Sequence, residues 1–428
     1  MSWVPVRAVE VSAWGLRVGA VAYDPGVGAH VFEYHPDWVE RGVELAPLTM
    51  PIRTRRHVFP QLPRETFHGL PAVLADSLPD DFGNAVIDAW LARQGVRRAS
   101  ATPLDRLAYM ADRAMGAMEF RPSRGPRQRT TSAVELSALV EGARSVLDAS
   151  FSDDRETESA IRSLIQVGTS AGGARAKAVV AWHPGTGEVR SGQLDAPEGF
   201  EHWLLKLDGL GGDRELGSGS ATGRVEYAYS LMARSAGVEI SECRLLEEGG
   251  RAHFMTRRFD RPAGGGKVHT TTLCGTAHLD YRQRQAHDYG QLLETVDRLG
   301  LGPEARAEAF RRMVFNVLAA NNDDHTKNAS FLLRSPGASW ELAPAYDLTY
   351  AHNPEGRWTY QHLMGVDGVF HDVRRDDVMR LADRFLVPGA AAVVDEVREA
   401  VEGWRGHADE AGVPDDVARH VEDDLPRW

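Results

Sequence analysis

The sequence has few cysteines and no long apolar segment. Its 428 residues include only two cysteines, Cys243 and Cys274, too few for a disulfide framework or a four-cysteine zinc site. No apolar run approaches the roughly 18 residues that cross a bilayer. Arg7, Glu10 and Arg17 interrupt the apolar residues that a signal peptide would need. We therefore expect a cytoplasmic protein with no membrane contact, where a reducing environment keeps thiols free.

The charge balance lacks the basic excess that is typical of nucleic-acid-binding chains. There are 61 acidic and 49 basic residues, which gives a net charge of −12, whereas a chain built mainly to grip nucleic acid is normally basic. Hydrophobic residues make up 43% and charged residues 26% of the chain, as in ordinary globular proteins. The length predicts two or three domains, or one large enzyme.

The first part of the chain, residues 1–125, predicts a small α+β unit. Valine-rich strands are expected within residues 4–34, and helices over 70–78 and 81–94. Residues 121–131 carry two prolines, one glycine, four arginines and no apolar residue. That composition predicts an exposed loop or linker after the first unit.

The remainder divides into a mixed segment, 132–262, and a mostly helical segment, 263–428. The mixed segment predicts an initial helix over 132–150, strands at 177–182 and 203–207, a helix over 225–236, and a hairpin with strands at 243–247 and 252–259. In the second segment the clearest helix covers 303–320, where apolar residues recur with helical spacing. The overall expectation is an α+β protein.

The most informative segment is polar and covers residues 321–328, between that helix and an expected strand. Asp323 and Asn328 stand five residues apart, the spacing of the catalytic loop of kinases. In such a loop the carboxylate reaches the attacking hydroxyl group, while the amide oxygen reaches a phosphate-bound Mg²⁺. Lys327 would neutralise charge on the transferred phosphoryl group. The alternative is a solvated loop at a helix end.

A second acidic residue follows at Asp347, after the expected strand pair 329–334 and 340–342. Kinases place a second metal-binding carboxylate at the corresponding point. Taken alone, Asp347 is equally typical of a turn. Together with Asp323 and Asn328, it favours a metal-dependent phosphoryl-transfer site.

A glycine-rich segment, residues 167–177, precedes the strand at 177–182. Glycines allow backbone N–H groups to approach phosphate oxygens closely. The segment fails as a Walker A loop, because Gly173 is followed by Ala174. It matches the G-x-S-x-G pattern of serine hydrolases over 168–172, but the expected helix before it and strand after it are the reverse of a nucleophile elbow. A kinase phosphate loop fits better.

Lys206 stands inside the apolar segment 203–207, where a lysine needs an anionic partner if it is buried. ATP phosphates or an acidic side chain would serve, and Glu226 on the next expected helix is a candidate for a structural ion pair. The alternative is an edge-strand lysine that points to water. The order of these features along the chain is the order found in a two-lobed kinase.

At this point the sequence resembles the HipA toxin kinase family over nearly its whole length. Segments similar to the family's motifs are 67–71, 76–80 and 82–83 in the N-terminal part, the phosphate loop 170–177, the hinge-side motif 258–261, the catalytic loop 323–328, and the pair 346–347. The resemblance implies a bilobal protein-kinase-like fold of HipA type. Its parts would be an N-terminal HipA subdomain (1–125), a kinase N-lobe with the glycine-rich loop (132–262) and a helical C-lobe (263–428).

The resemblance also implies roles for individual residues. Asp323 would be the catalytic base, with Lys327 and Asn328 beside it, and Asn328 and Asp347 would hold Mg²⁺. The implied ATP-binding residues are Gly172, Gly173, Ala174, Lys177, Lys206, Glu226 and Phe259. Ser170, or its neighbour Thr169, matches a position of autophosphorylation, which would disrupt the loop and lower activity.

The implied function is a serine/threonine protein kinase that uses ATP and Mg²⁺ and acts as the toxin of a toxin–antitoxin pair. Family substrates include aminoacyl-tRNA synthetases. The usual partner is a small helix-turn-helix antitoxin of HipB type, through which contact with DNA is mainly indirect. Two residues depart from the family pattern: Asp324 stands where glycine is frequent, and Arg257 where an acidic residue is expected. The extra carboxylate of Asp324 would bind a cation or face solvent.

Two other functions stay open at this point. One is a kinase-like binding module with weak or no catalysis, acting as a co-repressor beside a DNA-binding antitoxin. Arginines at 53, 55 and 56 and within 121–129 motivate it, although such arginines are also typical of a solvated loop. The other is a kinase for a small molecule, against which the N-terminal unit argues mildly.

Overall fold

The computed structural model describes residues 3–126, 134–147, 164, 175–208, 210 and 221–428. The chain forms two compact units. The first unit comprises residues 1–210, 257–271 and 332–339, and the second comprises 211–256, 272–331 and 340–428. The domain boundaries expected at 125, 132 and 262 remain a prediction.

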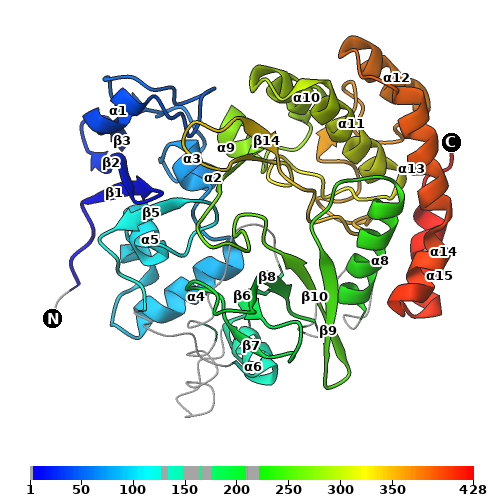
Figure 1. Ribbon diagram of the computed structural model, residues 1–428, viewed down its shortest axis with the longest axis horizontal. Coiled ribbons are helices and arrows are strands. Elements are labelled where there is room, and N and C mark those ends of the chain that lie inside the picture. Colours follow the sequence, from blue (N-terminus) through cyan, green and yellow to red (C-terminus); the bar gives the residue numbers. More distant parts are fainter. Residues whose placement is uncertain (1–2, 127–133, 148–163, 165–174, 209, 211–220) are drawn as a thin grey trace. The chain divides into compact units, whose positions relative to one another are not determined.

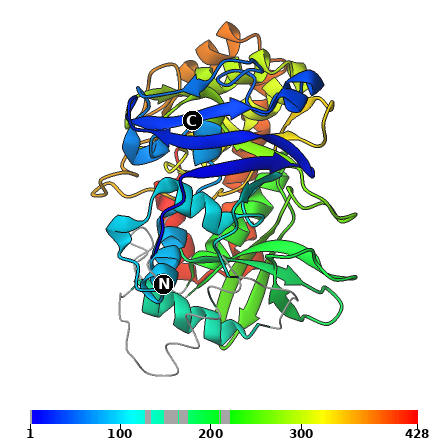
Figure 2. The same cartoon turned by 90° about the vertical axis from the view of Figure 1, so that its left-hand side faces the viewer.

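The first unit begins with a five-stranded sheet in the order β4-β3-β2-β1-β5. Its strands are β1 (Ala8–Ala13), β2 (Leu16–Asp24), β3 (Ala29–Tyr34), β4 (His57–Val58) and β5 (Met118–Arg121). In β1 the side chains of Val9, Val11 and Ala13 are fully buried, because successive side chains of a strand point to opposite faces. Figure 2 shows β1, β2 and β3 side by side in blue.

Short helices accompany this sheet in sequence: α1 (Pro36–Arg41), α2 (Arg64–Phe67), α3 (Ala72–Ala75), α4 (Asp81–Ala92), the 3₁₀ helix η1 (Arg98–Ser100) and α5 (Pro103–Met110). The helix expected over 70–78 is shorter than predicted and is α3 alone. Pro71 and Pro79 flank it, and proline does not continue a helix interior. Asp80 then caps α4, accepting a hydrogen bond at Oδ1 from the Gly83 N–H at 2.6 Å.

Further along the first unit lie α6 (Leu136–Leu147) and the strands β6 (Lys177–Trp182), β7 (Val189–Ser191) and β8 (Glu201–Lys206). β6 pairs antiparallel with both β7 and β8. Every residue of β6 is buried, which requires that both faces of the strand are covered. The strand predicted over 177–182 is confirmed, and it begins and ends at the predicted residues.

The second unit is mostly helical (Figure 1). It contains α8 (Thr222–Ser235), the hairpin of β9 (Cys243–Glu248) and β10 (Arg251–Arg257), then α9 (Leu273–Ala277), α10 (Tyr289–Arg298), α11 (Gly302–Leu318), α12 (Arg375–Arg384), α13 (Ala390–Glu402), α14 (Trp404–Ala411) and α15 (Asp415–Asp424). Helix α11 packs against α10 and α13, and α8 packs against α14. The apolar stripe predicted on α11 is confirmed, since Phe310, Met313 and Val314 are fully buried.

Short strands complete the description: β11 (His269–Thr272), β12 (His287–Asp288), β13 (Ser330–Leu333), β14 (Trp340–Leu342) and β15 (Met364–Gly365). Within the second unit β12 pairs parallel with β15. The polar segment 321–328 lies between α11 and β13, as the sequence predicts. Within the described ranges, no helix combines the length and the apolar character that crossing a bilayer requires.

Candidate active site

The polar loop 321–328 is fixed at both ends by backbone hydrogen bonds. At its start, the Asn322 N–H donates to the Ala351 carbonyl at 3.1 Å, and the Ala351 N–H donates to the Ala320 carbonyl at 3.1 Å. At its end, the Ala329 carbonyl accepts a hydrogen bond from the Leu273 N–H at 2.7 Å. The loop is therefore a defined part of the second unit and differs from the solvated helix-end loop that was the alternative.

Asp324 is a buried anchor of this loop. Its carboxylate accepts hydrogen bonds from the Tyr289 hydroxyl (2.8 Å) and from the backbone N–H groups of Leu363 (2.8 Å) and Met364 (3.3 Å), and His362 Nδ1 lies 3.0 Å from Oδ2. The side chain has no exposed surface. The expectation that Asp324 faces solvent or binds a cation is wrong, because its oxygens are occupied by hydrogen-bond donors of the protein.

The hydrogen-bond network continues from Asp324 into the helices. Asn316 on α11 donates through Nδ2 to the Tyr289 hydroxyl at 2.8 Å, and Asn321 donates through Nδ2 to Asn316 Oδ1 at 2.9 Å. Burial, followed by the charge of Asp324, raises the pKa of Tyr289 well above its ordinary value. The phenol therefore stays protonated and can donate to the carboxylate. Buried polar networks of this kind specify one arrangement of the groups that they join.

Asp323 and Asn328 approach each other across the turn of the loop. The Asn328 side chain donates through Nδ2 to the Asp323 carbonyl at 2.8 Å, and the Asn328 N–H donates to the His325 carbonyl at 2.8 Å. Since Nδ2 is engaged in this way, Oδ1 is the atom of the amide that can act as a metal ligand. Both residues are partly exposed, which their predicted roles require.

Two tyrosines contact Lys327 of this loop, and one of them, Tyr346, immediately precedes Asp347. Lys327 Nζ lies 4.8 Å from the centroid of the Tyr281 ring, a cation–π contact. The Tyr346 hydroxyl donates to the Lys327 carbonyl at 2.6 Å and lies 2.5 Å from Ser330 Oγ. Asp347, the next residue, has φ of 58°, a left-handed conformation that is uncommon outside glycine and is enriched at functional sites.

The oxygen donors of this loop fit the demands of Mg²⁺. Within the described residues, no three histidine, cysteine, aspartate or glutamate side chains gather into a complete metal cage. Mg²⁺ in phosphoryl-transfer sites, however, is typically held by one or two protein oxygen ligands and by phosphate and water oxygens. Asn328 and Asp347, the residues predicted to hold Mg²⁺, carry oxygen donors of the required type.

Two buried lysines face each other in the first unit. Lys177 on β6 and Lys206 on β8 are direct partners in the antiparallel register, so their side chains share one face of the sheet. Their exposed fractions are 2% and 9%. The possibility that Lys206 points to water is therefore excluded. Like charges at this distance are destabilising, so the pair requires anions nearby.

Asp80 supplies one of these anions. Its Oδ2 lies 3.2 Å from Lys177 Nζ, and both side chains are almost fully buried. Burial raises the pKa of Asp80, while the charge of Lys177 acts in the opposite direction. Sequence reasoning assigned no role to Asp80, and only its place within a family-like motif drew attention to it. Glu226 is buried on α8 of the second unit, and its ion pair with Lys206 remains a prediction.

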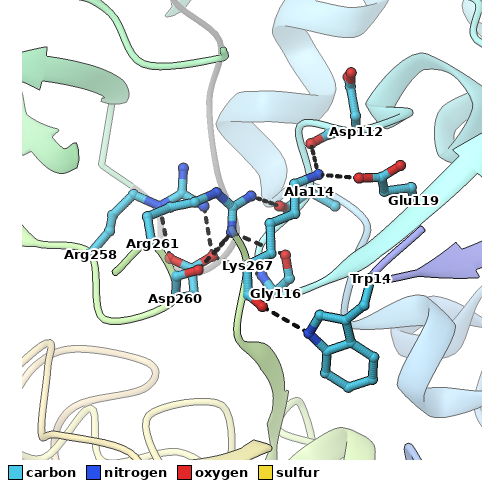
Figure 3. A network of polar contacts seen from close by, with 9 residues as sticks. All are labelled: Trp14, Asp112, Ala114, Gly116, Glu119, Arg258, Asp260, Arg261 and Lys267. Atoms are coloured by element: carbon cyan, nitrogen blue, oxygen red, sulfur yellow. Dashed lines mark hydrogen bonds and ion pairs between the residues drawn. The ribbon is translucent and has the colours of Figure 1, made fainter. Parts of the chain in front are cut away.

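The charged residues of the hinge-side motif, 258–261, form a buried network of ion pairs within the first unit (Figure 3). Arg258 donates through Nε and Nη2 to the Asp260 carboxylate at 2.9 and 2.7 Å, and Arg261 donates through Nη1 to the same group at 2.7 Å. The Gly116 N–H donates to Asp260 Oδ2 at 2.8 Å. Although burial opposes it, the two guanidinium groups hold the pKa of Asp260 well below its ordinary value.

Lys267 extends the contacts between residues 112–119 and the hinge-side segment (Figure 3). Its Nζ donates to the Asp112 carbonyl at 2.7 Å and to Glu119 Oε1 at 2.8 Å, and its carbonyl accepts from Trp14 Nε1 at 2.9 Å. The charged residues of the motif therefore join it to the N-terminal part of the chain. Phe259, partly exposed between them, keeps its ATP-binding role as a prediction.

Arg257 is part of a separate contact. Its guanidinium forms an ion pair with Glu201 Oε1 at 3.1 Å, on the first residue of β8. The Arg258 N–H donates to the His202 carbonyl at 2.9 Å, so the chain at 257–258 runs beside β8. A basic residue at 257 is thus accommodated by an acidic neighbour on the adjacent segment.

Several predicted residues fall outside the described part of the chain. They are Ser170, with its alternative Thr169, and the predicted phosphate-loop residues Gly172, Gly173 and Ala174. Lys177 is the predicted loop residue that the structure does describe, at the first position of β6. Roles for all of these remain predictions.

Known proteins resemble this chain in sequence and in structure. The protein Y4dM of Sinorhizobium fredii, whose name classes it provisionally as a kinase, is 26% identical over 209 residues. That match spans 42% of this chain and 46% of the relative, less than half of its length. A Helicobacter pylori proinflammatory kinase, CtkA, aligns over 53% of this chain and 92% of its own with 14% identity and a TM-score of 0.32, too low to carry an argument.

The structural likeness to HipA of Shewanella oneidensis MR-1 is much more extensive. That protein, solved in a complex with HipB and operator DNA, aligns over 97% of this chain and 94% of its own, with 15% identity and a TM-score of 0.65. The predicted α+β, kinase-like fold of HipA type is confirmed. The model of the HipA N-terminal domain matches residues 9–121, and that of the HipA-like C-terminal domain matches 169–404, more than half of the chain. The chain therefore belongs to the HipA family.

Proposed function

We propose that the protein is a kinase that transfers the γ-phosphoryl group of ATP to a serine or threonine hydroxyl group of another protein. The observation that carries the proposal is the loop that holds Asp323 beside Asn328 through the 2.8 Å hydrogen bond between them. A carboxylate followed by an amide ligand at this spacing is the catalytic arrangement of kinases. Membership of the HipA family supports the same reaction.

In this proposal the residues of the second unit carry out the chemistry. The Asp323 carboxylate accepts the proton of the attacking hydroxyl group. Asn328 and Asp347 hold Mg²⁺ through oxygen atoms, and Lys327 neutralises charge on the transferred group. The metal ion, when bound, offsets the charge that develops on the phosphoryl oxygens.

The residues of the first unit bind the nucleotide. Lys177 and Lys206, buried and opposite each other, provide the positive charge that a triphosphate requires. The backbone N–H groups of 172–174 donate to phosphate oxygens, and Phe259 contacts the adenine ring. Glu226, on α8 of the second unit, is the proposed ion-pair partner of Lys206, by analogy with other kinases.

The decisive experiment measures transfer of labelled phosphate from ATP in the presence of Mg²⁺. We expect modification of the protein itself or of a protein in a lysate, and a loss of about 10²–10⁴-fold for Asp323→Ala. Asp409→Ala, an exposed aspartate on α14, is the matched control and should retain full activity. Equal incorporation by wild type and Asp323→Ala would refute the proposal, and so would modification confined to a small molecule.

We extend the proposal to the biological setting. The target is a translation factor such as an aminoacyl-tRNA synthetase, and the protein is the toxin partner of a small helix-turn-helix antitoxin that makes most of the contact with DNA. The relative of known structure, solved with HipB and operator DNA, supports this partner. The two free, buried cysteines fit a cytoplasmic location. Comparing phosphoproteomes of cells that express wild type or Asp323→Ala would identify the target.

Self-inactivation is the remaining part of the proposal. Phosphate on Ser170 or Thr169 would add negative charge to the segment that precedes Lys177 and would lower activity. Mass spectrometry after incubation with ATP should find phosphate on one of these two residues. The variant without that hydroxyl should keep its activity for longer.

A second candidate function rests on the exposed arginines at 53, 55 and 56. As a co-repressor with little catalysis, the protein would use them to contact DNA beside an antitoxin. Arg56 already forms an ion pair with Glu33 at 3.2 Å, which weakens this reading. Salt-dependent DNA binding that survives Asp347→Ala, without measurable ATP binding, would favour it.

A further inference from the structure

Basic and aromatic side chains gather around Tyr281, immediately beside the catalytic loop. Lys327 Nζ lies 4.8 Å from the centroid of the Tyr281 ring, and the His325 ring lies 5.3 Å from it in an edge-on arrangement. The Arg282 guanidinium lies 5.3 Å from the same ring. Tyr281 therefore joins the loop that carries Asp323 to the segment between α9 and β12.

A second aromatic contact extends this region. The Arg284 guanidinium lies 5.5 Å from the centroid of the Trp358 ring, and its Nη1 donates to the Arg357 carbonyl at 2.7 Å. Trp358 is 41% exposed, and Arg284 and Arg357 are exposed as well. We call Tyr281, Arg282, Arg284, Arg357 and Trp358 the Tyr281 surface. All five belong to the second unit.

Hydrogen bonds hold the Tyr281 surface in place relative to the catalytic loop. Thr326 Oγ1 donates to the Leu279 carbonyl at 2.7 Å, and the Arg282 N–H donates to Asp280 Oδ1 at 3.0 Å. Gln285 Nε2 donates to Gln361 Oε1 at 2.9 Å. A surface fixed in this way presents its cations in a defined position, so less conformational entropy is lost when a ligand binds.

The charge of the Tyr281 surface differs from that of the whole chain. It contributes three arginines in a protein whose net charge is −12. The acidic residues near it in sequence are Glu355, which is exposed, and Asp280, which is buried and engaged with the Arg282 backbone. A guanidinium that packs on an aromatic ring still directs N–H groups away from the ring, and these can donate hydrogen bonds to a carboxylate.

We propose that the Tyr281 surface binds an acidic segment of the protein substrate that flanks the hydroxyl group to be phosphorylated. The inference rests on the proposed kinase activity and adds the substrate class to it. Arginine pairs carboxylates bidentately, and tyrosine and tryptophan supply apolar contact area. A nucleic acid is the less suitable partner, since the remaining surface of this acidic chain repels a long polyphosphate.

The test compares serine peptides that differ only in their flanks, which carry aspartate and glutamate, uncharged residues, or lysine. We expect wild type to have the highest kcat/KM for the acidic peptide, with a preference that weakens as salt is added. Arg284→Ala should raise KM for that peptide about ten-fold with little change in kcat. Arg298→Ala on α10, 52% exposed in its side chain, is the matched control and should behave as wild type.

Two further measurements separate this inference from the proposed function. Arg284→Ala should still hydrolyse or transfer phosphate from ATP without peptide at the wild-type rate, because it removes none of the proposed catalytic residues. Fluorescence anisotropy with labelled acidic peptide should show binding that Arg284→Ala and Trp358→Ala weaken, even if no phosphoryl transfer occurs. Equal kcat/KM for all three peptides, or tight binding of a single-stranded RNA with none of the acidic peptide, would overturn the inference.

Discussion

Lys177 and Lys206 occupy directly opposite positions on the antiparallel strands β6 and β8, and both side chains are buried. Two ammonium groups on one face of a sheet repel each other and lose their hydration. A protein retains such a pair at a cost in stability when the pair serves a ligand. A triphosphate is the ligand that the proposed function assigns to them.

Replacing one of these lysines should therefore affect both stability and binding. We expect Lys206→Met to lower the thermal stability of the nucleotide-free protein, because it removes the proposed cationic partner of the buried Glu226. Binding of ATP should weaken by at least about ten-fold, since a charge-assisted contact contributes about 1.5–3 kcal/mol. Calorimetric titration with ATP and thermal unfolding of the same samples would check both. Unchanged ATP affinity would contradict the assignment.

Asp80 offers a complementary prediction through its ion pair with Lys177 at 3.2 Å. Asp80→Asn keeps an oxygen that can cap α4 but leaves Lys177 without this counter-charge. We expect the nucleotide-free protein to lose about 3 kcal/mol, and ATP to raise the melting temperature more than it does in wild type, because phosphate replaces the missing anion. Glu40→Gln, at an exposed position of α1, should change neither quantity.

Asp324 should control activity without touching the substrate. Asp324→Asn replaces an oxygen that accepts hydrogen bonds by an amide nitrogen that cannot, within a group that contacts Tyr289, His362, Leu363 and Met364. The loop that carries Asp323 then loses its position. We expect kcat to fall by at least about ten-fold, with little change in the dissociation constant of ATP. A normal kcat in a protein that unfolds at lower urea would show that the network is purely structural.

Asp260 makes a prediction about pH. Its folded pKa is depressed by Arg258 and Arg261 although burial opposes this, so its ionisation stabilises the fold above the unfolded carboxyl pKa of about 4. That contribution is lost as the pH falls towards the folded value. Asp260→Asn should cost about 3–5 kcal/mol near neutral pH, and its difference from wild type should shrink below about pH 4. Urea unfolding at pH 7 and pH 3 would measure it, and a constant difference would contradict the assignment.

Local patterns predicted the elements that local physics decides. The strand 177–182 and the buried stripe on α11 follow from the periodicity of neighbouring residues. The helix expected over 70–78 covers only Ala72–Ala75, because Pro71 and Pro79 limit it on both sides. The difference at Asp324 has another physical reason. A single carboxylate in a polar loop carries no sign of whether distant segments will cover it.

The sequence by itself determined the order of motifs and the chemical types at the proposed site: a glycine-rich segment, a strand lysine, and a carboxylate followed by an amide. Only the tertiary structure decided which charges meet. Asp80 forms an ion pair with Lys177, the 362–364 segment covers Asp324, and the Gly116 N–H donates a hydrogen bond to Asp260. Each of these pairings joins residues that are far apart along the chain. The strength of each interaction depends on its burial by distant segments, which no local periodicity encodes.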